Sequence, residues 1–108
     1  WPDIAGDVPA VDVVVCHRLL PHLSAEERAW ALREVARVAR RTVVLSFANA
    51  GTARARRRMR RGLASTVFLE EAQLAEEARA LGLDLEPPVL QKRLSVIAIA
   101  VLRVRGSA

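Results

Sequence analysis

The hydrophobic positions of this chain fall into short unbroken runs and into stretches with helical spacing. Residues 11–16 hold four valines in six positions, and residues 42–47 and 94–104 are similarly apolar. Short β-branched runs of this kind are typical of strands that are covered on both faces. We therefore predict buried strands at these three places. An outer strand is predicted at 83–86, where apolar residues alternate before two prolines.

Three other stretches have the periodicity of amphipathic helices. The first is predicted over residues 24–40 and opens with a capping box, in which Ser24 and Glu27 bond each other's main-chain amides. The second covers 52–62, is rich in arginine and has only a thin apolar stripe. The third covers 70–81 and is followed by a glycine, which favours a helix end.

The predicted order is strand, helix, strand, helix, helix, strand, strand, with residues 65–69 as an extended link. Strands joined by helices are parallel by preference. The last two strands are joined without a helix, which favours an antiparallel hairpin. We therefore expect an α/β fold with a mostly parallel sheet and a C-terminal antiparallel hairpin, in a single domain over residues 1–108.

Composition narrows the class of protein. A chain of 108 residues that is 52% hydrophobic is expected to form one small globular core. With two Phe, two Trp and no Tyr, it is poor in the aromatic side chains that stack on single-stranded nucleic acid. One cysteine excludes an internal disulfide and suits a reducing compartment, so we expect a cytoplasmic protein. No signal peptide is visible, and the longest apolar run is too short to span a bilayer, so no membrane partner is expected.

Polar residues follow the first predicted strand directly. In parallel sheets ligands bind beyond the carboxyl ends of the strands, so Cys16, His17 and Arg18 are candidate site residues. The alternative is a polar strand end without a ligand. His17 and His22 lack the spacing of a paired metal site and no acidic cluster supports them, so we predict no metal. The remaining candidates, Asp3, Asp7 and Asp12, are interpreted as solvated loop and strand-start residues rather than catalytic acids.

Several motifs occur in an order that resembles a known family. The first is an aspartate followed by an apolar strand and a His-containing loop, at 12–23, and the second is the Arg-Glu-x-x-Arg-Val pattern at 33–38. The third is a helix that ends in a small residue and Gly, at 80–83, and the fourth is the closing hairpin. From about Val11 onward the chain resembles the C-terminal half of a class I S-adenosylmethionine-dependent methyltransferase. The resemblance implies a Rossmann-like sheet with helices on both faces, of which the chain covers the second half.

The chain departs from that family at two positions within the matched part. Arg40 and Arg41 stand where a Pro-Gly-Gly turn is usual, and Val11 stands where an aromatic residue is usual. The glycine-rich loop that cradles the cofactor in the family is not in this chain. Two explanations are open: the chain is the C-terminal portion of a longer protein, which we favour, or it is a half-domain that cannot bind the cofactor alone.

The resemblance also implies roles for particular residues. It implies S-adenosylmethionine as the cofactor, with Cys16, His17 and Arg18 beside its methionine part and the first two residues near its adenine; these two are Trp1 and Pro2. His22 is a candidate base or loop-orienting residue, although a histidine that bonds main chain at the start of a helix would look the same.

The arginine run from Arg54 to Arg61 has three interpretations. Six of its residues are arginines, which exceeds the net charge of +5, so the rest of the chain is not basic. The run could bind an acidic substrate or RNA phosphates. It could form the substrate lid that the family builds here, which makes Arg54, Arg57 and Arg58 candidate substrate contacts. It could also be a solvated face in a chain that uses sixteen Arg and one Lys.

The predicted function is methyl transfer to a small-molecule acceptor. Transfer from a sulfonium needs alignment and a dry site more than acid–base groups, so the lack of a catalytic triad is no objection. The aspartate-proline-aromatic motifs of amino-methylating enzymes are absent, which disfavours nucleic acid as acceptor. The alternative is a non-catalytic basic α/β module that binds RNA or a partner protein through residues 54–61. A nicotinamide-dependent reductase is the third interpretation, disfavoured by the closing hairpin, and the oligomeric state stays open.

Overall fold

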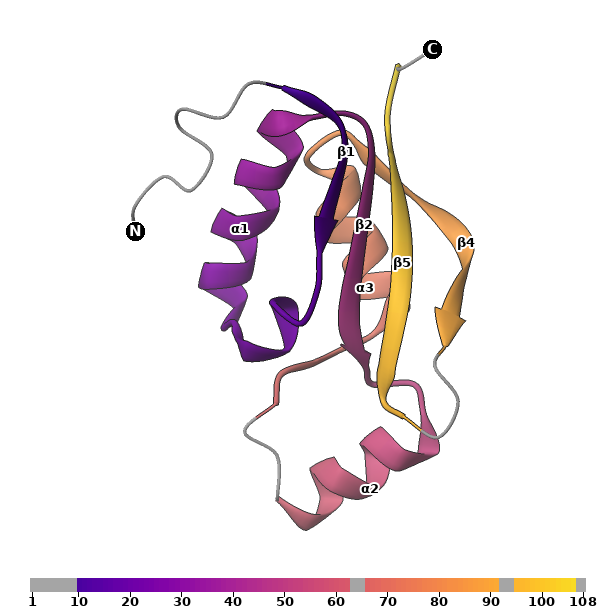
Figure 1. Cartoon of the computed structure of the whole chain (residues 1–108). Helices are drawn as coiled ribbons and strands as arrows, with labels where there is room; N and C mark the ends of the chain where they lie inside the picture. The colour runs from indigo at the N-terminus through magenta and orange to yellow at the C-terminus, as the bar shows by residue number, and fades with distance from the viewer. Residues whose placement is uncertain (1–9, 63–65, 92–94, 107–108) are drawn as a thin grey trace.

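The computed structural model describes residues 10–62, 66–91 and 95–106, and it shows one mixed sheet with helices packed against it (Figure 1). In chain order the elements are β1 (Val11–Cys16), the short 3-10 helix η1 (Leu20–His22), α1 (Ala25–Val38), β2 (Ala39–Asn49), α2 (Ala53–Arg61), β3 (Phe68–Leu69), α3 (Glu71–Arg79), β4 (Leu83–Gln91) and β5 (Ile97–Val104). No described helix is long and apolar enough to cross a membrane.

The sheet has the topology that the sequence predicts. Its strand order is β1-β2-β5-β4, with β1 parallel to β2 and β5 antiparallel to both of its neighbours. The mostly parallel sheet and its C-terminal antiparallel hairpin are therefore confirmed. One strand was not predicted: β3, in the segment expected to be an extended link, pairs in parallel with the end of β2 at Ala48 and Asn49.

Helices α1 and α3 lie on the same face of the sheet (Figure 1). Their buried side chains join those of β2, β4 and β5 in one core, which includes Leu32, Val35, Phe47, Leu74, Leu83 and Leu102. The sequence predicts helices on both faces. The shared face follows from the strand order, because the chain moves from β1 to β2 and from β2 to β4 in the same direction, and right-handed crossovers then fall on one side.

The opposite face of the sheet is not covered by α1 or α3. On β1, Val13 is 52% exposed and Val15 is 68% exposed, whereas Val14 and Cys16 pack against the core. The prediction that this strand is covered on both faces is therefore wrong for the described residues. The reason is that an unbroken valine run hides the alternation of the strand, since valine is equally suited to an exposed or a buried position on a pleated sheet.

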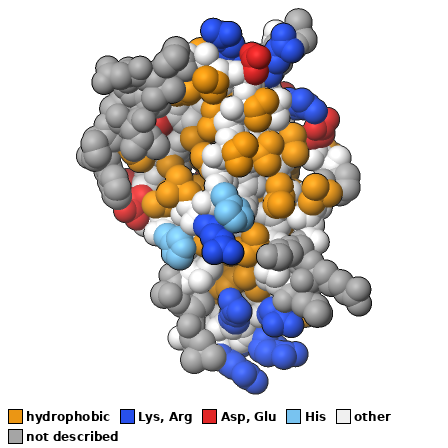
Figure 2. Space-filling model, viewed as in Figure 1, with side chains coloured by type: hydrophobic (Ala, Val, Ile, Leu, Met, Phe, Trp, Pro, Cys, Tyr) orange, Lys and Arg blue, Asp and Glu red, His pale blue; other side chains and the backbone are white. Residues whose placement is uncertain are grey.

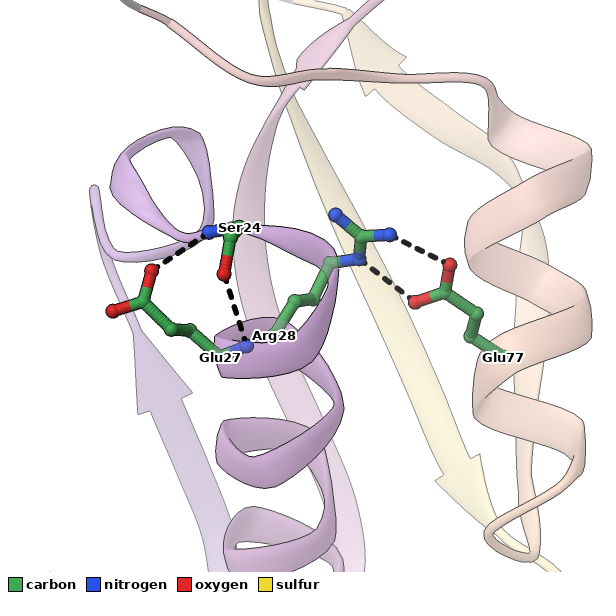
Figure 3. Close-up of polar contacts among 4 residues, drawn as sticks. All are labelled: Ser24, Glu27, Arg28 and Glu77. Carbon is green, nitrogen blue, oxygen red and sulfur yellow. Dashed lines mark hydrogen bonds and ion pairs between the residues drawn. The ribbon is translucent and has the colours of Figure 1, made fainter. Parts of the chain in front are cut away.

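Boundaries of the first helix and second strand also differ from prediction. Helix α1 ends at Val38, and Arg40 and Arg41 belong to β2, which has 11 residues. The capping box is confirmed: the Ser24 hydroxyl accepts from the Glu27 amide at 3.2 Å and the Glu27 carboxylate accepts from the Ser24 amide at 2.9 Å (Figure 3). Thus the start of α1 is determined locally and its end is determined by pairing with β1.

A partly buried ion pair joins α1 to α3. The Arg28 guanidinium donates to both carboxylate oxygens of Glu77, at 2.8 and 2.9 Å (Figure 3). The Arg28 side chain is 4% exposed and that of Glu77 is 29% exposed. The two-point geometry fixes the distance between the helices.

Candidate functional site

A cleft of about 680 Å³ opens at the carboxyl ends of β1 and β2, on the face of the sheet that α1 and α3 leave open. Its walls come from the segment after β1, from α2, and from the ends of β4 and β5. Figure 2 views this face: hydrophobic side chains cover its centre, the two histidines lie at their edge and the arginines of α2 lie beyond. The described lining residues are His17, Arg18, Pro21, His22, Arg58, Thr66, Leu90, Gln91, Ser95, Val96, Ile97 and Ile99.

The backbone turns sharply at Arg18, which has a left-handed φ of 61°. This conformation is costly for a residue with a side chain and is found disproportionately at functional sites. A hydrogen bond stabilises it, because the Arg18 amide donates to the hydroxyl of Ser46 on β2 at 2.8 Å. Ser46 is 2% exposed, so the turn is tied to the interior of the sheet.

The segment after this turn is held against the body of the protein by η1. Leu20 and Pro21 are buried, and the Pro21 carbonyl accepts from the Val67 amide at 2.9 Å. This contact links η1 to the residue just before β3. As a result His17 and His22 both line the cleft and are exposed.

A network of amide side chains supports the other side of the cleft. Asn49 at the end of β2 donates to the Gln91 side chain at 3.0 Å. Gln91 in turn donates to the Ser95 carbonyl at 2.8 Å and to the Ile97 carbonyl at 3.0 Å. Gln91 therefore connects the ends of β2, β4 and β5 at the rim of the cleft.

Helix α2 is attached to the sheet by a small contact. Ala55 is fully buried against Ala48 and Val96, and Thr52 caps the helix by accepting from the Ala55 amide at 3.0 Å. The helix ends near the predicted position, where Gly62 adopts the left-handed conformation with φ 65°. The helix therefore stands at the carboxyl end of the sheet with most of its surface in solvent.

The structure separates the predicted site residues into four groups. His17, Arg18, His22 and Arg58 line the cleft, whereas Arg54 and Arg57 do not. Cys16 is half-buried and packs against the core, where burial raises the pKa of its thiol above the usual 9.0. The last group, Trp1 and Pro2, lies outside the described residues. The assignment of each residue to cofactor, catalysis or substrate stays a prediction.

Sequence reasoning missed several residues of the cleft. Sequence reasoning also missed Ser46, which supports the turn beside the cleft, although it carries a signal as the one polar residue between Val43 and Ala48. Gln91 and Leu90 follow two prolines and were not predicted to belong to β4 at all. No group of three or more metal-binding side chains occurs among the residues that the structure describes.

Comparison of the sequence with protein-family models and with curated proteins gives no match. Solved structures do match. Magnesium protoporphyrin IX methyltransferase from Synechocystis PCC 6803, crystallised with SAH, has a TM-score of 0.76 and 22% identity, covering 97% of this chain and 49% of that chain. CalO1, a methyltransferase in calicheamicin biosynthesis, has a TM-score of 0.67 and 26% identity, covering 88% of this chain and 30% of that chain.

A third solved structure is the O-methyltransferase NcsB1 from neocarzinostatin biosynthesis, in complex with SAM and 2-hydroxy-5-methyl naphthoic acid. Its TM-score is 0.64 at 19% identity, over 90% of this chain and 30% of that chain. This chain thus spans about half the length of the Synechocystis protein and about a third of the other two. Over the part that it spans, the chain has the fold of a class I S-adenosylmethionine-dependent methyltransferase, with the strand order and closing hairpin of the second half of that fold.

Proposed function

We propose that this chain is the C-terminal portion of an S-adenosylmethionine-dependent methyltransferase that methylates a small molecule. The observation that carries the proposal is the strained turn at Arg18, held by Ser46 beside a cleft of about 680 Å³. This cleft lies beyond the carboxyl ends of parallel strands, where α/β sheets bind their ligands. The solved neighbours that contain SAM or SAH support the choice of cofactor.

The residues after β1 fit such a cofactor at one end. His17 and Arg18 are exposed at the carboxyl edge of the sheet. The fold resemblance assigns their backbone atoms, with those of Cys16, to the methionine part of the cofactor, and it directs their side chains toward the acceptor. When bound, S-adenosylmethionine supplies a methyl group activated by its sulfonium. The assignment of Trp1 and Pro2 to the adenine is part of the same proposal.

The side chains of the cleft can prepare an acceptor for methylation. A neutral imidazole nitrogen of His17 or His22 accepts the proton that an acceptor hydroxyl loses as its oxygen gains the methyl group. Leu90, Ile97 and Ile99 form an apolar wall on which the acceptor packs, which orients it. Alignment and proton removal are then supplied by this chain's own residues.

Nothing in the comparisons supports the alternative function, in which α2 binds RNA or a partner protein. Of the six arginines of the run, Arg58 alone is among the described residues that line the cleft. A small acceptor uses that cleft, whereas an RNA would use the exposed remainder of the helix. We therefore retain the small-molecule acceptor.

Calorimetry with SAH and a methyl-transfer assay on a panel of phenols test the proposal on the full-length protein. We expect SAH to bind and at least one phenol to be methylated. His22→Ala is expected to lower kcat by about a hundredfold if His22 is the base, and His22→Asn is expected to restore activity if it only orients the loop. A folded full-length protein that does not bind SAH would refute the proposal.

A further inference from the structure

The cleft is cationic on one side. Arg18, Arg58, His17 and His22 line it, and no Asp or Glu occurs among its described lining residues. At pH 7 its two guanidinium groups give it a formal charge of at least +2. A neutral or cationic acceptor would gain nothing from this charge.

Several arginines elsewhere in the described chain form ion pairs with carboxylates. Examples are Arg28 with Glu77, Arg103 with Glu86, and Arg105 with Asp84, at 2.8 to 3.1 Å. By contrast, no described acidic residue forms an ion pair with Arg18 or Arg58. The described carboxylates thus lie outside the lining of the cleft.

The other side of the cleft is apolar and faces solvent. Leu90 is 62% exposed and Ile99 is 36% exposed, and both line the cleft together with Val96 and Ile97. Large aliphatic side chains grouped in this way beside a few polar groups are typical of sites for small molecules. One end of the cleft thus suits a hydrocarbon body, and the other suits an anion.

Resting on the function proposed above, we propose that the methyl acceptor is an acidic amphipathic small molecule. Its apolar body lies on Leu90 and Ile99, and its carboxylate or phosphate is bound by the guanidinium of Arg58 together with that of Arg18. Guanidinium groups bind both oxyanions through paired N–H donors, which gives orientation as well as affinity. Arg58 is therefore a specificity-determining residue.

Binding of three related ligands to the SAH-loaded full-length protein tests this proposal. The ligands are 4-hydroxycinnamate, its neutral carboxamide and 4-hydroxybenzylphosphonate, titrated calorimetrically at low and at physiological salt. We expect the carboxylate or the phosphonate to bind about tenfold or more tightly than the carboxamide. Which of the two anions binds better identifies the acidic group.

Arginine variants separate a specific contact from general attraction. Arg58→Ala and Arg18→Ala are expected to remove most of the preference for the anion. The matched control is Arg60→Ala, which removes the same charge from α2 but does not line the cleft. Arg58 and Arg60 are both exposed, so neither substitution removes core packing. Equal melting temperatures of the two variants would show that a loss of binding is local.

Each result has a definite meaning. Equal affinity for acid and carboxamide, no binding of any of the three, or equal losses from Arg58→Ala and Arg60→Ala would overturn the proposal. If SAH still binds in those cases, the methyltransferase function stands without the acidic acceptor. If the acid binds selectively but SAH does not bind, the cleft's anion preference stands and the methyltransferase function fails.

Discussion

The main-chain amide of Arg18 donates a 2.8 Å hydrogen bond to the hydroxyl of Ser46, across the boundary between β1 and β2. This contact joins a left-handed turn, at φ 61°, to a side chain that is almost completely buried in the sheet. Strand β1 ends at Cys16, directly before His17 and Arg18. The contact therefore fixes the point at which the segment that contains these two residues leaves the sheet. The shape of one wall of the cleft therefore depends on it.

Removing the hydroxyl of Ser46 is expected to destabilise the protein. Ser46→Ala leaves the partly buried Arg18 amide without its acceptor, at a cost of about 1–2 kcal/mol in the free energy of unfolding. Urea denaturation measures this cost. The control is Ser95→Ala, whose hydroxyl accepts from the Ile97 amide in a more exposed position, so its loss is expected to be smaller. Equal costs for the two substitutions would contradict the structural role of Ser46.

The strain at Arg18 predicts that glycine is more stable than alanine at this position. Arg18→Gly removes both the side chain and the left-handed strain, whereas Arg18→Ala removes the guanidinium and keeps the strain. The difference between the two variants is expected to be about 1 kcal/mol in favour of Gly. Thermal or chemical denaturation of the pair measures it, and a more stable Ala variant would mean that the turn is not left-handed in solution.

The partly buried pair between Arg28 and Glu77 predicts an asymmetric response to mutation. Glu77→Leu leaves the nearly buried guanidinium without a partner and is expected to cost about 3 kcal/mol. Arg28→Met leaves a carboxylate that is 29% exposed and can be hydrated, so its cost is expected to be smaller. Arg41→Met is the control, because the pair of Arg41 with Asp12 is exposed and long, at 4.0 Å, and is worth less than about 0.5 kcal/mol.

Acid stability is expected to depend in part on Asp84. Hydrogen bonds from Arg105 lower the pKa of this carboxyl below its usual 3.8, with a smaller contribution from the charge of Arg79. Because the folded pKa is the lower one, the stabilisation is complete above the unfolded pKa and is lost as the pH falls through the folded pKa. Asp84→Asn is expected to flatten the fall in melting temperature below about pH 4. Arg105→Met should flatten it equally, and an unchanged slope in both variants would exclude this pair as the source.

Gln91 is expected to affect the acceptor more than the cofactor. Gln91→Leu removes the side-chain bonds to Asn49, to the Ser95 carbonyl and to the Ile97 carbonyl, so the end of β4 loses its side-chain link to the end of β2 and to the start of β5. We expect KM for the acceptor to rise several-fold while SAH affinity stays constant. Gln73→Leu, at an exposed position of α3, is the matched control and should change neither value.

The elements that could be predicted from sequence are those determined by neighbouring residues. The capping box at Ser24 defines the start of α1, and Thr52 and Gly62 bound α2 within one residue of prediction. The carboxyl-edge location of His17 and Arg18 followed from the end of the valine run. These features need only local spacing, so a single sequence contains them.

The features that could not be predicted depend on pairing between distant segments. Val13 and Val15 are of the residue type that also fills buried strands, so the sequence does not distinguish them. Their exposure follows from the side of the sheet on which both crossovers fall. Gln91 becomes part of the cleft because β4 continues past two prolines to pair with β5 at Ala98. No pattern in the sequence predicts how β4 aligns with β5.

The exposed valines of β1 have a consequence for handling the protein. Among the described residues no strand pairs with the outer edge of β1, so its amide and carbonyl groups are available beside bare aliphatic side chains. A preparation in which this edge stays uncovered is expected to form oligomers by adding strand to strand as concentration rises. The solubility of any truncated form of the protein is therefore expected to depend on whether another strand covers the outer edge of β1.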